Sequence, residues 1–129
     1  MNAEFEKSIL DKYYFFGDNN WKTNMNTSCI CWGFECDDGW QKLISDLCEE
    51  LDEFLKVHPN PDFRVSQVKS KFGGLRFYVE NEGDDYKAIY DIIDKYEKKS
   101  YHTCEYCGAE NATQVGRWVM TLCPDCQKK

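Results

Sequence analysis

Two pairs of closely spaced cysteines near the C-terminus constrain this chain more than any other feature. The first pair is Cys104-x2-Cys107 and the second is Cys123-x2-Cys126, with fifteen residues between them. This spacing is typical of a zinc ribbon, in which each CxxC loop presents two sulfurs to one ion and the connecting stretch forms a hairpin. Four thiolates fill a tetrahedral ion and leave no position for a substrate water, so the sequence predicts one structural Zn2+. The alternative interpretation is two disulfides.

Length and composition indicate one folded unit. The chain has 129 residues, of which 42% are hydrophobic, so it can bury a core of its own. We expect a single domain over residues 1–129, in which residues 101–129 form a zinc-ribbon lobe. The N-terminal segment lacks the apolar run of a secretory signal, and no stretch approaches the roughly 20 apolar residues of a membrane helix. With eight cysteines and no signal, the expected location is a reducing cytoplasm, without a membrane partner.

The net charge of −7 limits the partners that the chain can have. Coating nucleic acid non-specifically requires clustered Lys and Arg that neutralise phosphates, which disfavours this function. An acidic chain remains compatible with a basic protein partner, or with a local basic site inside an acidic surface.

Hydrophobic periodicity predicts three amphipathic helices and a β-hairpin. The fold class that follows is α+β, with a small antiparallel sheet packed against helices and the four-cysteine ribbon at the C-terminus. Residues 18–38 show no clear period and are expected to be irregular. The predicted helices cover residues 3–16, 40–55 and 86–96, and the predicted strands cover residues 63–69, 75–81 and 115–122.

The predicted hairpin is locally basic in an acidic chain. Four cations and no acid lie between Phe63 and Tyr78, and two glycines at the turn could let a ligand approach backbone N–H groups. Cations, bare amides and an aromatic ring suit a flat anionic ligand, such as a nucleotide or a short single strand. The alternative is a solvated strand face on which cationic stems cover aromatic rings. The predicted ligand-binding residues are Arg64, Lys69, Lys71, Gly73, Gly74, Arg76 and Tyr78, with Trp32 as a second stacking residue.

The segment from Trp32 to Trp40 is a second candidate. It combines large aromatic side chains with the acids Glu35, Asp37 and Asp38. One interpretation is a wall of a ligand pocket, and the other is a plug over the core with acids that cap a helix.

Four other cysteines precede the ribbon: Cys29, Cys31, Cys36 and Cys48. They could form a second metal site, although their spacing is not that of a standard cysteine loop. The alternative is buried thiols, because free cysteine is among the most buried residue types.

Patterns for catalysis are sparse, so an enzyme is the less favoured class. His58 adjoins a proline at a predicted helix end, and His102 precedes the first cysteine pair. Asp62, Gln67 and Lys69 resemble the pattern of a metal-dependent nuclease, but a glutamine stands where a second carboxylate is needed.

Three segments together resemble a known family. WGFECDDGW, QVKSKFGGLRFYVE and TCEYCG…GRWVMTLCPDC occur in this order. They are similar to the forms WGFECGDGW, QVKEKFGGLRFY and CxxCG…GW…TLCxxC of a widespread family of small, mostly uncharacterised phage and prophage zinc-ribbon proteins. The resemblance covers about residues 25–126, and this chain departs from it at Asp37, where the family commonly has Gly, and at Ser70, where it has Glu. It implies a phage accessory protein with a structural zinc ion, and it implies no established activity.

Several functions follow as hypotheses. The first is a non-catalytic protein that binds an anionic ligand, such as a nucleotide signal of host defence, through the basic hairpin. The second is an inhibitor that binds a host protein through its surface. A metal-dependent nuclease or nucleotide hydrolase is less favoured because the sequence offers no convincing acid–base pair. A ribbon that binds DNA is less favoured because the ribbon carries charges of both signs.

Overall fold

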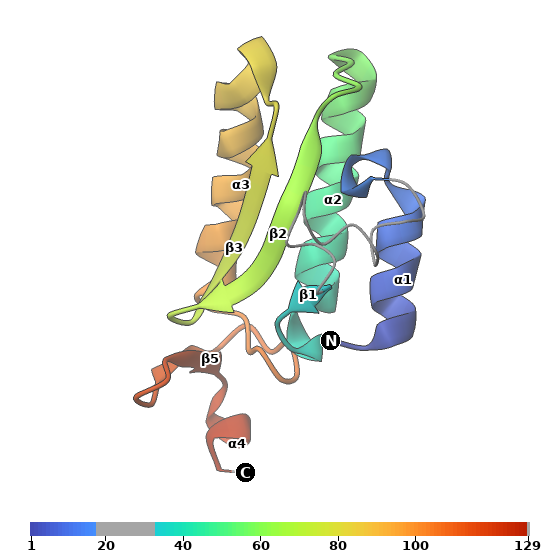
Figure 1. Cartoon of the computed structure of the whole chain (residues 1–129). Helices are drawn as coiled ribbons and strands as arrows, with labels where there is room; N and C mark the ends of the chain where they lie inside the picture. Colours follow the sequence, from blue (N-terminus) through green and yellow to red (C-terminus); the bar gives the residue numbers. More distant parts are fainter. Residues whose placement is uncertain (18–32, 129) are drawn as a thin grey trace.

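The computed structural model describes residues 1–17 and 33–128 (Figure 1). Trp32, Cys29 and Cys31, which the sequence singled out, lie outside these residues. The α+β class is confirmed, with two small sheets and four α-helices in the described part of the chain. The α-helices are α1 (Ala3–Lys12), α2 (Gln41–Val57), α3 (Tyr86–Ser100) and α4 (Pro124–Gln127); the strands are β1 (Phe34–Glu35), β2 (Arg64–Lys71), β3 (Gly74–Glu80), β4 (Thr113–Val115) and β5 (Met120–Leu122).

The larger sheet has the order β1-β2-β3 and is mixed rather than purely antiparallel. β2 and β3 form the predicted hairpin, in which Lys69 pairs with Arg76 and Val68 with Phe77. The short β1 adds a parallel partner on the other side of β2, with Phe34 beside Val68. Two residues carry no periodicity of their own, so only the pairing with β2 defines this strand.

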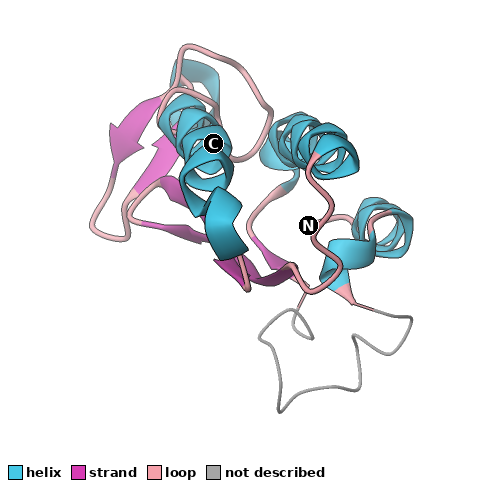
Figure 2. Cartoon of the chain, turned by 90° about the horizontal axis from the view of Figure 1, so that it is seen from above, coloured by secondary structure: helices cyan, strands magenta, loops and turns pink. Residues whose placement is uncertain are grey.

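Helices α2 and α3 run side by side along the hairpin (Figure 1), and the view from above shows the helices together on one side of the sheet (Figure 2). Val65, Val68, Leu75 and Phe77 are all buried on this side. Leu75 and Phe77 share it by alternation, whereas Val65 and Val68 are three residues apart and share it because the pairing of β2 shifts register between Val65 and Gln67. Trp40 lies in the same core, fully buried at the start of α2. The opposite face of the hairpin therefore carries its polar side chains.

The helix ends follow from local chemistry. α2 stops at Val57 because Pro59 follows closely and cannot continue the hydrogen-bonded ladder. α1 stops at Lys12, before the expected end, and a 3-10 turn over Tyr14–Phe16 follows it. Phe15 and Phe16 are buried by this turn rather than by a continued helix, which explains why periodicity overestimated the helix.

A second, smaller hydrophobic cluster belongs to the C-terminal segment. It contains three of the ribbon cysteines together with Ala112 and Leu122, and β4 and β5 form its hairpin. In Figure 1 this lobe lies at the end of the main sheet where β2 turns into β3.

Candidate functional site

The four ribbon cysteines converge on one point. The Sγ atoms of Cys104, Cys107, Cys123 and Cys126 all lie within 4.8 Å of one another. The Cys107 and Cys123 sulfurs are 3.6 Å apart, close to the edge of about 3.8 Å that a tetrahedral ion with metal–sulfur bonds of about 2.3 Å would give. All four are free thiols, so the structure carries no disulfide between them. The cluster could hold a metal ion.

The backbone of the first cysteine loop favours a thiolate. Burial opposes ionisation of Cys104, but N–H groups of Cys123, Cys107 and Tyr106 point at its sulfur and lower its pKa to about 6. The left-handed turn at Gly108 (φ +85°) closes this loop and lets its N–H donate to the Cys104 carbonyl at 2.9 Å. A thiolate that is stable near neutral pH is the form that binds a metal.

Glu105, inside the first cysteine loop, ties the lobe to the main sheet. Its side chain is 1% exposed and accepts hydrogen bonds from Ser70 Oγ of β2 and from the Thr121 N–H of β5, each at 2.6 Å. Burial raises the pKa of this carboxyl, and the two donors lower it in part. Because both oxygens are satisfied, the buried acid fixes the orientation of the lobe.

The segment before α2 completes this contact. Gly39 donates its N–H to the Glu105 carbonyl at 2.8 Å, and a Cβ at position 39 would lie 2.1 Å from the Cys104 carbonyl oxygen. The indole N–H of Trp40 donates to the Thr103 carbonyl at 2.9 Å. The DGW sequence is therefore a docking surface for the cysteine loop, which the sequence did not indicate. Trp40 is buried in the core, as the plug interpretation expects, but neither Asp37 nor Asp38 makes the expected side-chain cap of the following helix.

The two hairpin glycines face the lobe as well. A Cβ at Gly74 would lie 2.5 Å from the Tyr101 ring, and the Gly73 carbonyl accepts a hydrogen bond from Thr121 Oγ1. Both glycines are buried. The expectation that they expose backbone to a ligand is corrected: the lobe occupies that space.

The other predicted residues of the hairpin separate into two groups. Lys69, Lys71, Arg76 and Tyr78 gather at the end of the hairpin that adjoins the lobe, and the Lys69 ammonium lies 5.8 Å from the centre of the Tyr78 ring. Arg64 lies at the far end of β2, where its guanidinium donates to the Pro61 and Phe63 carbonyls, each at 2.8 Å. The structure thus does not bring Arg64 to the other cations.

A groove of about 400 Å³ lies between β3 and α3, beside this first group. Two cations enter it, Lys71 and Arg76, with one acid, Glu97, so its lining carries one net positive charge. Three partly exposed aromatic rings also line it, namely Phe72, Tyr78 and Tyr90. The sequence did not mark Phe72, Tyr90 or Glu97 as site residues; Tyr90 belongs to the apolar stripe of the predicted third helix, and only the structure shows that its ring is partly exposed.

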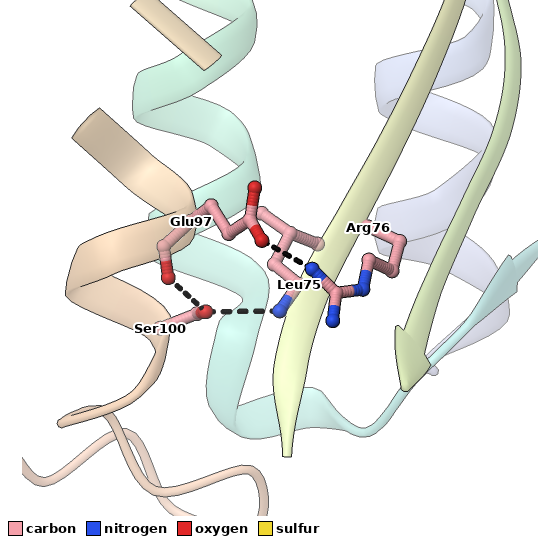
Figure 3. A network of polar contacts seen from close by, with 4 residues as sticks. All are labelled: Leu75, Arg76, Glu97 and Ser100. Carbon is pink, nitrogen blue, oxygen red and sulfur yellow. Dashed lines mark hydrogen bonds and ion pairs between the residues drawn. The ribbon is translucent and has the colours of Figure 1, made fainter. Parts of the chain in front are cut away.

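Arg76 is held in place from α3. Its guanidinium forms an ion pair with Glu97, and one turn further along α3 Ser100 Oγ accepts the Leu75 N–H at 2.9 Å (Figure 3). The Ser100 hydroxyl donates in turn to the Glu97 carbonyl. Arg76 has five N–H donors, and the ion pair recorded in the structure is made through one of its nitrogens, so others remain for a ligand.

A larger cavity of about 690 Å³ lies where α2 begins, α3 ends and the first cysteine loop approaches. Its charges are mixed, and Lys42 is bound to Asp46 at 2.8 Å. Its rings are those of Tyr96 and His102, and the Tyr96 hydroxyl donates to Glu50. This cavity offers neither an excess of cations nor several aromatic faces, so it fits a flat anion less well than the groove does.

The remaining candidates have structural environments. Cys36 and Cys48 are buried in the main core, and burial raises the pKa of both thiols, that of Cys36 to about 12. Asp62 precedes β2 whereas Lys69 lies near its other end, a span of about 20 Å at 3.3 Å per residue, so the nuclease-like pattern is not assembled. His58 stacks on the Phe54 ring at 4.6 Å. Asp38 accepts hydrogen bonds from the Asn2 N–H and from Gln41.

Comparisons of the chain with family models, curated proteins and solved structures each gave no match. The resemblance to the phage zinc-ribbon family therefore stays a prediction. None of the described helices is long and apolar enough to cross a membrane.

Proposed function

We propose that this chain is a non-catalytic binding protein that holds a nucleotide-like anion in the groove between β3 and α3, on a fold maintained by one structural zinc ion. The observation that carries the proposal is the lining of the groove. Phe72, Tyr78 and Tyr90 offer flat faces for a base, and Lys71 and Arg76 offer charged donors for a phosphate.

The position of Arg76 supports the same proposal. A guanidinium that is already paired with Glu97 loses little side-chain entropy when it binds a phosphate with its free donors. Lys71 has no ion pair within residues 1–17 and 33–128, and its ammonium lies 5.7 Å from the centre of the Phe72 ring. It is therefore available to a ligand that stacks on this ring.

Zinc is the metal that four thiolates in tetrahedral arrangement favour. Bound there, the ion would hold the two cysteine loops together and supply folding free energy rather than chemistry. The role of this chain's own residues is to present thiolates and, through Glu105, to orient the lobe against β2.

The first test is isothermal titration calorimetry of the zinc-loaded protein with AMP, GMP and inorganic phosphate. We expect a nucleotide to bind more tightly than phosphate alone, and Arg76→Gln to weaken binding at least about tenfold through the loss of charged hydrogen bonds. Lys98→Gln is the matched control, because it removes the same charge from an exposed site on α3. Failure of every nucleotide to bind, or an Arg76→Gln affinity equal to that of wild type, would contradict the proposal.

The resemblance to phage accessory proteins motivates a more specific version, in which the ligand is a nucleotide signal of host defence that the protein sequesters. Native mass spectrometry of protein purified from infected cells tests it. A small mass that accompanies wild-type protein, is absent from Arg76→Gln and is released on denaturation would support sequestration. Protein that carries zinc alone would favour the alternative of a host protein as the target.

A further inference from the structure

The turn between β2 and β3 displays an aromatic ring at a conformational cost. Phe72 and Gly73 are its two central residues, and both have positive φ, +54° and +80°. Two such residues are typical of a type I′ turn, for which Asn-Gly is the preferred sequence and a bulky side chain in the first position is unfavourable. The Phe72 side chain is 68% exposed, so no burial in the described structure offsets this cost. Unfavourable backbone conformation without a packing gain indicates a functional reason for the ring.

The lobe also exposes an aromatic ring at a hairpin turn. Trp118 lies in the turn between β4 and β5 and is 92% exposed. Large exposed aromatic side chains are uncommon on a free surface and are enriched where proteins bind ligands or partners. Neighbouring Arg117 has no recorded ion pair in the described part of the chain.

The two turns lie side by side. A Cβ at Gly73 would lie 3.3 Å from Val119 Cγ1, so the residues that follow Phe72 and Trp118 are in contact distance of each other. In Figure 1 the hairpin turn and the lobe turn both point to the left of the view, the second below the first. Phe72 also lines the groove, so a lining residue of the groove directly precedes the glycine that lies against the lobe turn.

Cations accompany the rings in both places. The groove lining combines Arg76 and Lys71 with the rings of Tyr90, Tyr78 and Phe72, and in the lobe turn Arg117 precedes Trp118. Glu97 is the one acid among the groove residues, and it is paired with Arg76. Aromatic rings that stack successive bases, beside cations that follow the backbone, are the pattern of sites for single-stranded nucleic acid.

We propose that the ligand is a short single-stranded oligonucleotide, with one base in the groove and further bases stacked on Phe72 and Trp118. This inference rests on the proposed function and extends it from one nucleotide to about two or three. The length is limited because the rest of the chain is acidic, with a net charge of −7, and repels additional phosphates.

Fluorescence titrations with dTMP, (dT)3 and (dT)12, and with the matching uridine compounds, test the proposal on zinc-loaded protein. We expect (dT)3 or (rU)3 to bind at least about tenfold more tightly than the mononucleotide, because each added stacked base strengthens binding by this order. Trp118→Ala should remove this gain and leave the affinity for the mononucleotide unchanged. Equal affinity for the 3-mer and the 12-mer supports the inference, because the acidic surface does not bind the added nucleotides. A steep further gain with the 12-mer contradicts the limit of two or three nucleotides and indicates a longer strand as the ligand.

Two further variants separate function from folding. Phe72→Asn creates the preferred Asn-Gly turn, so we expect it to raise the resistance to urea while it weakens (dT)3 binding. Tyr86→Ala is the control, because Tyr86 is 57% exposed at the other end of α3. Equal binding of the mononucleotide and the 3-mer, or unchanged 3-mer binding in Trp118→Ala, overturns this inference but not the proposed function. Either result assigns Trp118 to a protein partner instead. If none of these compounds binds, both this inference and the proposed function are overturned.

Discussion

The carboxylate of Glu105, in the first cysteine loop, accepts a hydrogen bond from the Ser70 hydroxyl of β2 at 2.6 Å. These residues are 35 positions apart. Ser70 lies on the sheet that packs on the larger hydrophobic cluster and Glu105 follows Cys104 of the smaller one, so their contact joins the C-terminal lobe to the main sheet. This contact lies close to the groove, since Phe72, which lines the groove, follows Ser70 by two residues, and Gly73 next to it is buried against the lobe.

Glu105→Ala should lower the free energy of unfolding of the zinc-loaded protein by about 2–4 kcal/mol. It leaves the buried Thr121 N–H without its acceptor and opens a void at a site that is 1% exposed. Urea denaturation measures the change. Glu105→Gln is the control: its oxygen can accept from Thr121 and its amide can donate to Ser70, so its loss should be clearly smaller. Equal losses in both variants would mean that the negative charge, and not the hydrogen bonding, fixes the lobe.

Gly39→Ala should destabilise the protein more than Gly74→Ala does. Both positions have negative φ, so the difference lies in the neighbours and not in backbone strain. At position 39 the new methyl group would lie 2.1 Å from a backbone oxygen of Cys104, whereas at position 74 it would meet the side chain of Tyr101, which is able to rotate. We expect a loss above about 2 kcal/mol for Gly39→Ala, measured by urea denaturation. A larger loss for Gly74→Ala would show that the Tyr101 ring is fixed and carries the contact.

Removal of the metal should release the lobe. We expect one zinc ion per chain by native mass spectrometry, and a chelator or Cys123→Ser should remove it and lower the melting temperature. Cys48→Ala is the matched control, since this thiol is fully buried in the main core away from the cluster. It should reduce stability through lost packing while it leaves the zinc content at one. A second ion that is lost on Cys36→Ala would instead establish the second metal site.

The pair Glu50 and Tyr96, which joins α2 to α3, should give a measurable pH dependence. The Tyr96 hydroxyl donates to Glu50 at 3.0 Å, and a hydrogen bond from Lys95, ahead of that from Tyr96, lowers the pKa of the Glu50 carboxyl. A lowered folded-state pKa means that the ionised form stabilises the fold above about pH 4.5, and that this stability is lost as the pH falls through the folded-state pKa. The difference in unfolding free energy between wild type and Glu50→Gln should therefore shrink as the pH is lowered from 6 toward 3.5.

The comparison at each pH cancels the acid loss of metal, which both proteins share. At alkaline pH the dependence is opposite, since stability is lost as the pH rises. Burial raises the pKa of Tyr96 to about 12, so its contribution is complete below about pH 10 and is lost between pH 10 and 12. Tyr96→Phe should abolish this second change. A constant difference across either range would show that the pair does not contribute to stability.

Elements with a strong local pattern were predictable from the sequence. The stripe from Leu43 to Leu55 is buried along α2, and the hairpin pairs as expected around a glycine-containing turn. The strand β1 was not, since its two residues acquire their conformation only through Val68 of β2. The end of α1 was missed because Phe15 and Phe16 continue the helical period but are buried by a 3-10 turn.

The candidate site was also predictable only in part, because contacts between distant segments decide which of its residues come together. The cations Lys69, Lys71 and Arg76 share one end of the hairpin because strand pairing brings them together, whereas Arg64 is separated by the length of β2. Glycines 73 and 74 signalled close approach by another group. Their neighbours in the structure are Tyr101 and Thr121 of the lobe, which the local sequence could not identify.

By itself, the sequence determined the four clustered thiols that could hold a metal ion and the faces of the helices and the hairpin, because both depend on spacings of a few residues that local geometry converts directly into positions. Only the tertiary structure decided what these faces meet: that the cysteine loop docks through Glu105 on Ser70, that Glu97 orients Arg76, and that the turns carrying Phe72 and Trp118 adjoin. Those relationships join residues tens of positions apart. They depend on how two hydrophobic clusters pack against each other, and no local spacing encodes that packing.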